Sequence, residues 1–130
     1  MDLDDLRRLR RARDRMDREF ADPITVPDLA AEALMSPGHF QRAFRRAYGE
    51  TPHAHLMGRR VERAQHLLRT TELTVTEVCH LVGATSLGSF SAAFTRIVGC
   101  TPTAYRRADH SAIAQVPGCI ARTALRPRAR

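Results

Sequence analysis

The sequence carries one pattern twice, and this repeat constrains the fold more than any other feature. The matching pairs are 24–29 (ITVPDL) with 73–78 (LTVTEV), 36–44 (SPGHFQRAF) with 86–94 (SLGSFSAAF), and 49–52 (GETP) with 99–102 (GCTP). The offset grows from 49 to 50 residues after the first pair, so the turn of the second copy holds one more residue. A short apolar helix, a turn and a second helix that begins at Ser are typical of a helix-turn-helix element. The repeat therefore predicts an all-α fold with two such elements.

Local signals place the predicted helices. An apolar stripe runs through residues 2–21, which predicts a first helix that ends before Pro23. Thr25 and Thr74 each stand three residues before an acid, as in a capping box, and open short helices over 26–34 and 75–82. Paired Phe residues four positions apart share one face of each following helix, which we expect to be its core face. These pairs are Phe40 with Phe44 and Phe90 with Phe94.

A longer helix is predicted between the two copies, from Pro52 to about Arg69. At ~1.5 Å per residue it would span ~27 Å, and we expect it to act as a rigid spacer. The predicted organisation is an N-terminal helix at 1–22, a first helix-turn-helix unit at 23–50, a linker helix at 51–72, a second unit with a final helix at 73–108, and a basic tail at 109–130. The sequence leaves the role of the tail open.

The charge of the chain is basic and unevenly distributed. The 130 residues include 21 Arg and Lys side chains, all of them Arg, against 14 acids, for a net charge of +7. Residues 1–35 hold seven Arg and nine acids, net −2, whereas residues 36–130 hold fourteen Arg and five acids, net +9. GC-rich coding and the fit of the guanidinium fork to phosphate and guanine explain the Arg usage equally well. The excess begins at the first Ser-led helix, which is the charge distribution expected of a DNA-binding surface.

Other classes of protein are disfavoured. No stretch has the length of a membrane span, and the acidic N-terminus is unlike a signal peptide, so we expect a cytoplasmic protein. Cys79, Cys100 and Cys119 form no CxxC and leave an odd count, which argues against a disulfide framework. We expect Cys79 in the core and keep redox sensing at Cys100 open. Neither metal-ligand spacing nor a nucleophile and base motif is found, so no metal, no cofactor and no enzymatic activity are expected.

Residues 24–107 resemble the DNA-binding domain of the AraC/XylS family of bacterial transcription regulators. The signature is in the second copy, at 73–78, 86–94 and 99–106 (GCTPTAYR). The resemblance implies seven helices, with two helix-turn-helix units joined by a long helix, and double-stranded DNA as the partner. It also implies that the second helix of each unit enters a major groove. The short chain resembles the small stand-alone members of the family, for which a direct inducer is not expected.

Candidate site residues follow from the outer faces of the two Ser-led helices. The candidates for base reading are Gly38, His39, Gln41, Arg42 and Arg45 in the first helix, and Leu87, Gly88, Ser91, Ala92 and Thr95 in the second. Gln bonds adenine and Arg bonds guanine through two hydrogen bonds each, and Gln41 and Arg42 match family positions that face bases. The family commonly has Arg where this chain has Ala92, so weaker reading is expected from the second unit. The candidates for phosphate binding are Ser36, Arg46, Ser86, Arg96, Arg106 and Arg107.

Plainer roles remain open for several of these residues. Solvated Arg side chains on a basic surface would look the same in the sequence, and His39 is as well explained by packing at a helix start. Tyr105 continues the apolar pattern of the last helix and is expected in the core. The favoured function is a sequence-specific regulator that binds two adjacent major-groove segments as a monomer. The alternatives are an adaptor that contacts RNA polymerase and a nonspecific nucleoid-type DNA binder.

Overall fold

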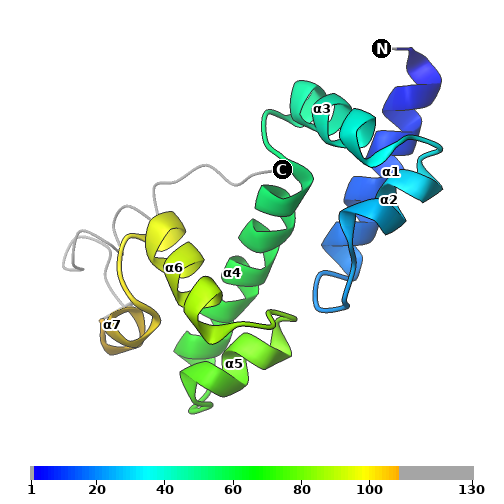
Figure 1. Ribbon diagram of the computed structural model, residues 1–130. Helices are drawn as coiled ribbons and strands as arrows, with labels where there is room; N and C mark the ends of the chain where they lie inside the picture. The colour runs from blue at the N-terminus through cyan, green and yellow to red at the C-terminus, as the bar shows by residue number, and fades with distance from the viewer. Residues whose placement is uncertain (1, 109–130) are drawn as a thin grey trace. The chain divides into compact units, whose positions relative to one another are not determined.

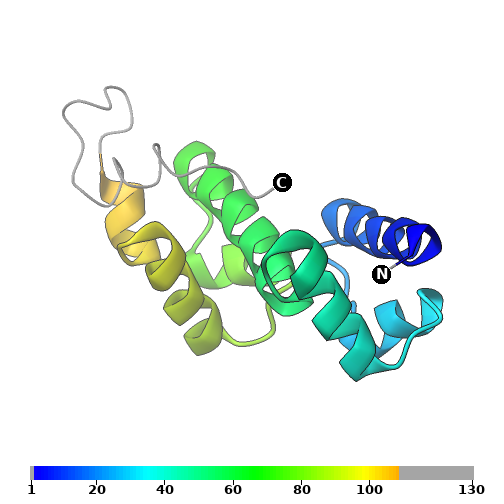
Figure 2. The same cartoon turned by 90° about the horizontal axis from the view of Figure 1, so that it is seen from above.

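A computed structural model describes residues 2–108, and the basic tail lies outside them. The described residues form seven α-helices and no strand, which confirms the all-α prediction (Figures 1 and 2). The helices are α1 (Leu3–Arg18), α2 (Val26–Glu32), α3 (Pro37–Tyr48), α4 (Pro52–Thr70), α5 (Val75–Leu81), α6 (Leu87–Val98) and α7 (Pro102–Arg107). None of these helices is long and apolar enough to cross a membrane. The chain divides into two compact units, Met1–Arg59 and Arg60–Arg130, and the division falls inside α4.

The first unit is built around α1, α2 and α3, each of which packs against the other two. Its core residues are Leu9, Ala12, Met16, Ile24, Leu29, Ala30, Ala33, Met35, Phe40, Ala43, Phe44 and Leu56. The predicted apolar stripe of α1 is buried only in its later turns, since Leu3 and Leu6 are exposed. With 16 residues, α1 is longer than α2, which has 7, and α3, which has 12. The two shorter helices therefore leave the first turns of α1 uncovered.

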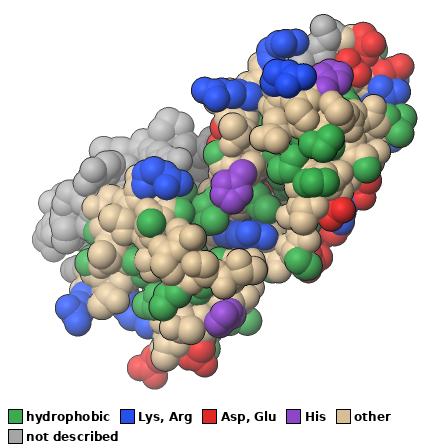
Figure 3. Space-filling view, viewed as in Figure 1, with side chains coloured by type: hydrophobic (Ala, Val, Ile, Leu, Met, Phe, Trp, Pro, Cys, Tyr) green, Lys and Arg blue, Asp and Glu red, His purple; other side chains and the backbone are tan. Residues whose placement is uncertain are grey.

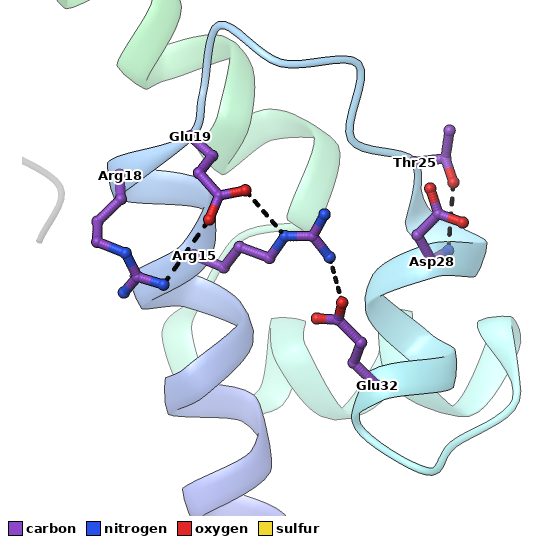
Figure 4. A network of polar contacts seen from close by, with 6 residues as sticks. All are labelled: Arg15, Arg18, Glu19, Thr25, Asp28 and Glu32. Atoms are coloured by element: carbon purple, nitrogen blue, oxygen red, sulfur yellow. Dashed lines mark hydrogen bonds and ion pairs between the residues drawn. The ribbon is translucent and has the colours of Figure 1, made fainter.

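Polar contacts tie α1 to the rest of the first unit. The Arg15 guanidinium donates to Glu19, the C-cap residue of α1, with 3.3 Å between Nε and Oε1, and to Glu32 at the end of α2 (Figure 4). Nearby, the buried imidazole of His55 is hydrogen-bonded through Nε2 to Asp17 Oδ1 of α1 at 2.7 Å and through Nδ1 to Glu50 Oε2 at 2.9 Å. These contacts link the N-terminal helix to α2 and to the start of α4.

The second unit combines the later part of α4 with α5, α6 and α7. Within it, α5 packs against α6 and α6 packs against α7. The ring of Tyr105 is buried, meets Phe94 edge-on at 5.6 Å, and its hydroxyl accepts a hydrogen bond from Arg69. The core position expected for Tyr105 is therefore confirmed. Fully buried side chains from α4, α5 and α6 complete this core, among them Val61, Ala64, Val78, Cys79, Phe90 and Phe94.

Caps define the ends of the helices, largely as the sequence predicts. Thr74 and Glu77 form a complete capping box, and the hydrogen bond from the Thr74 N–H lowers the pKa of the Glu77 carboxyl. At α2 only the hydroxyl half is observed among the described residues, where Thr25 accepts from the Asp28 N–H at 3.2 Å. The Asp side chain is one methylene shorter than Glu, so it has less reach toward the capping residue.

The turns of the two helix-turn-helix elements differ at their left-handed residue. Gly83 occupies this conformation in the second turn with φ of 91°, whereas the first turn places Leu34 there with φ of 58°. Leu34 is also 75% exposed, so burial does not offset the strain of its backbone. A side chain costs about 1–2 kcal/mol in this region relative to the right-handed conformation.

Replacing Leu34 by Gly should therefore stabilise the first unit by about 1 kcal/mol, because Gly adopts positive φ without the steric penalty. Urea unfolding followed by circular dichroism measures the change. Leu6→Gly is the matched control, since Leu6 is an exposed residue in the interior of α1 and Gly should cost about 1 kcal/mol there. A loss of stability in Leu34→Gly would contradict the assignment of strain to this turn.

Candidate nucleic-acid interface

Helix α3 presents the predicted base-reading residues on one exposed surface. Ser36 caps its N-terminus by accepting a hydrogen bond from the His39 N–H, and Gly49 ends it with φ of 79°. Phe40 and Phe44 are fully buried, which anchors the opposite face of the helix in the core. The exposed residues of α3 are Pro37, Gly38, His39, Gln41, Arg42, Arg45 and Arg46, so the structure brings all five predicted base-reading residues of the first unit onto the surface of one helix.

Gly38 and Arg42 are coupled along α3. A Cβ atom built at Gly38 would lie 3.1 Å from the nearest guanidinium nitrogen of Arg42, one turn further along the helix. The guanidinium therefore lies over the first turn of α3, where a side chain at position 38 would crowd it. The sequence reasoning did not find this contact, although the spacing of four residues between Gly and Arg is a usable signal for it.

The charge of α3 is available to a ligand. The helix contains Arg42, Arg45 and Arg46 and no acidic residue, and within the described part of the chain none of the three forms an ion pair. The Arg side chains of α1 behave differently, because Arg7 and Arg8 pair with Asp4 and Asp5. In the space-filling view, basic side chains gather over α3 (Figure 3). Four of the seven Arg side chains of α1 are thus ion-paired, whereas none of the three in α3 is, within the described residues.

Helix α6 presents a different surface. It buries Phe90, Ala93, Phe94 and Val98, and the predicted base-reading residues Gly88, Ala92 and Thr95 lie on the other side. Leu87, Gly88, Ala92 and Thr95 are exposed, and Ser91 is half-buried. The Thr95 hydroxyl donates to the Ser91 carbonyl at 2.8 Å, so its proton is used within the helix. The surface over α6 is mostly hydrophobic and neutral (Figure 3).

The predicted phosphate-binding residues fall into three groups. Ser36 and Ser86 cap helices, since Ser86 accepts from the Ser89 N–H at 3.2 Å as Ser36 does from His39. Arg46, Arg96 and Arg107 are exposed. Arg106 is half-buried and donates to the carbonyls of Leu68 and Thr71, each at 3.2 Å. Its guanidinium is thus engaged at the end of α4, where orphan carbonyls need donors. The phosphate role of all six stays a prediction, and for Arg106 it competes with this capping role.

Arg13 and His55 contact aromatic residues of α3, and the sequence did not predict either contact. The Arg13 guanidinium lies 4.2 Å from the centre of the Tyr48 ring, which ties α1 to the last residue of α3. Phe44 contacts both Tyr48 and His55 edge-on, with ring centres 4.8 and 5.9 Å apart. Nothing in the local sequence around His55 indicates its two carboxylate partners, Asp17 and Glu50.

The cysteines and histidines of the described residues are the candidates for a metal or redox site. Within residues 2–108, no three His, Cys, Asp or Glu side chains are grouped in a way that would hold a metal ion. Cys79 is fully buried, as expected, and burial raises the pKa of its thiol, which disfavours the reactive thiolate. Cys100 is half-buried, and Cys119 lies outside the described residues.

Known proteins match this arrangement. The transcriptional activator RclR of Escherichia coli K12, described as RCS-specific, is 40% identical over 82 residues, covering 63% of this chain and 29% of RclR. The DNA-binding domain of the global transcriptional factor AdpA, solved in complex with a target DNA, is 35% identical with a TM-score of 0.70, covering 75% of this chain and 88% of that one. A probable AraC family transcriptional regulator from Rhodopseudomonas palustris CGA009 is 26% identical with a TM-score of 0.71, covering 78% and 95%.

The matches cover most of this chain but only part of its longer relatives. This chain spans about a third or less of the length of the curated relatives it matches. A family model described as a helix-turn-helix domain matches residues 29–108, which is more than half of the chain. That segment includes both helix-turn-helix elements except the start of α2, together with α4 and α7. With its two helix-turn-helix elements joined by α4, the chain belongs to the AraC/XylS family of helix-turn-helix transcription regulators.

Proposed function

We propose that this protein is a sequence-specific DNA-binding transcription regulator that reads two adjacent major-groove segments with α3 and α6. The observation that carries the proposal is the exposed surface of α3, where Gln41 and three Arg side chains stand opposite a fully buried Phe pair. An exposed cationic helix face on a helix-turn-helix scaffold is the geometry that enters a major groove. The DNA complex of the similar AdpA domain supports the same partner.

The chemistry of α3 suits specific recognition. Arg42 can donate two hydrogen bonds to O6 and N7 of guanine, and Gln41 can bond N6 and N7 of adenine. Each good pair of this kind contributes about 1–3 kcal/mol of discrimination between bases. Arg45 and Arg46 extend the positive charge of the same helix toward its C-terminal end. We therefore propose that α3 supplies most of the hydrogen-bonding specificity and that the other cations mainly position the protein on phosphates.

The protein is proposed to bind double-stranded DNA as a monomer, because one chain supplies both reading helices. Its relatives are transcription regulators rather than enzymes, which supports a non-enzymatic role in the cytoplasm, where bacterial DNA lies. We propose that any contact with RNA polymerase is made by the protein while it is bound to DNA. No residue in the described part of the chain favours activation over repression.

Selection of bound duplexes from random DNA, followed by footprinting on the selected site, tests the proposal. We expect protection of one defined site that persists in an excess of unrelated competitor DNA. Protection of every sequence alike would indicate a nucleoid-type binder instead. Absence of any protection by a folded protein, with binding to RNA polymerase retained, would indicate an adaptor. Either of these outcomes would overturn the proposed function.

A further inference from the structure

We infer that α6 reads thymine methyl groups, so that the second segment of the DNA site is recognised by apolar contact rather than by paired hydrogen bonds. The inference rests on the proposed function, because it requires α6 to lie in a major groove. It begins from the composition of the helix. Between Leu87 and Thr95 there is no charged, amide or imidazole side chain, whereas α3 carries His39, Gln41, Arg42 and Arg45 over the same part of the repeat.

The exposed face of α6 consists of small and apolar groups. Gly88, Ala92 and Thr95 lie on the side away from the buried Phe90 and Phe94. Leu87 and the half-buried Ser91 are closer to the Phe side of the helix. Leu87 is 44% exposed although it is a large hydrophobic residue at the very start of the helix. Ala92 adds one methyl group where Arg42 stands in the first unit. A bidentate contact to a base edge is not available from any of these side chains.

The hydroxyl of Thr95 does not change this character. It donates to the Ser91 carbonyl at 2.8 Å, so the donor is satisfied within the helix and its use on a base would require breaking that bond. The Thr95 methyl group and one acceptor position of its hydroxyl oxygen remain for contact. Among the base edges that face the major groove, only thymine presents an apolar group, its C5 methyl. Leu87, Ala92 and Thr95 therefore match thymine better than any other base.

Gly88 permits the close approach that such contacts need. A Cβ built at this position would meet only the Ser86 hydroxyl oxygen, at 4.0 Å, so packing inside the protein does not require Gly here. Van der Waals contact between methyl groups falls off within about 1 Å of its optimum, so the helix backbone must lie close to the bases. The missing side chain at position 88 leaves room for DNA on the face that carries Ala92 and Thr95.

Replacing thymine by deoxyuridine tests the inference, since this change removes the C5 methyl and keeps base pairing. The α6 segment of the selected site is identified as the one whose base preferences survive Arg42→Ala. We expect wild-type protein to bind about fourfold more weakly for each contacted methyl removed there, which corresponds to burial of one methyl-sized group. Binding is measured by fluorescence anisotropy at fixed salt, with the same substitutions in a flanking segment as the DNA control.

Paired variants of Thr95 make the assignment specific. Thr95→Ser removes the methyl and keeps the hydroxyl, so it should weaken binding to the thymine duplex and lose sensitivity to deoxyuridine at the contacted position. Thr95→Val keeps a methyl without the hydroxyl and should retain that sensitivity. Equal wild-type affinity for thymine and deoxyuridine duplexes, with preference for the selected site intact, would overturn the inference and leave the proposed function standing. If selection yields no preferred site at all, the proposed function fails, and the inference fails with it.

Discussion

Replacing Arg42 by Ala should relax the preference for one or two base pairs and weaken binding to the selected site by about 1–3 kcal/mol, roughly five- to 150-fold. The physical reason is the loss of a two-pronged contact to guanine, which no neighbouring side chain can replace. Affinity for unrelated DNA should change much less, because only one of several cations is removed. Anisotropy titrations on the selected duplex and on its single-base variants measure both effects.

Arg46→Ala provides the matched control for Arg42. Both residues are exposed on α3, but Arg46 is predicted to meet phosphate, so its loss should weaken binding to all sequences alike and reduce the salt dependence by about one counterion. Gly38→Ala provides a second comparison, because the added Cβ would displace the Arg42 guanidinium by a few tenths of an ångström without removing its charge. Equal losses for Arg42→Ala on selected and random DNA would reassign Arg42 to the phosphate backbone.

Inserting two alanines after Arg59 should reduce affinity for the selected site by about a hundredfold or more and shorten the footprint to the segment of one unit. The insertion adds residues to α4 at the point where the chain divides into its two compact units. Two added residues turn the following part of a helix by about 200° and move it by ~3 Å. If α4 is a rigid spacer, both reading helices then cannot occupy successive grooves together.

Gly58→Ala is the control for the insertion. It lies next to the insertion point but keeps the helix register, and a Cβ built there meets nothing within 4 Å. We expect it to stabilise α4 by about 1 kcal/mol and to retain the complete footprint. A proline at the fully buried Val61 would be a poorer test, because it would also remove a core side chain. A complete footprint from the two-alanine insertion would contradict the rigid-spacer model.

The fold was predictable because its signals are local and occur twice. Thr and Ser caps, the paired Phe residues and the glycines after α3 and α6 each follow from a few neighbouring positions, and the structure reproduces them. The repeat also shows that the second turn is one residue longer, and the structure places Gly83 at its left-handed position. The left-handed conformation in the first turn could not be predicted, because Leu at position 34 is not a residue type that favours positive φ.

The contacts that depend on distant residues were not predictable. Arg106 has the sequence context of a surface cation, yet its partners are carbonyls 35 and 38 positions earlier in the chain. His55 is similar, since one of its two carboxylate partners comes from α1, 38 positions away. The exposure of the α3 candidates was predictable from helical spacing, because the buried Phe pair determines which residues lie opposite.

The packing of α1 changes what counts as an autonomous folding unit. The family match begins at residue 29, yet Leu9, Ala12 and Met16 of α1 belong to the core against which Phe40 and Phe44 are packed. A fragment trimmed to the matched segment would expose that core and deprive His55 of Asp17. The orientation of α3 therefore depends partly on residues of α1, which the family match does not include. Exchanging α1 between homologues should then alter DNA recognition although no DNA-facing side chain is changed.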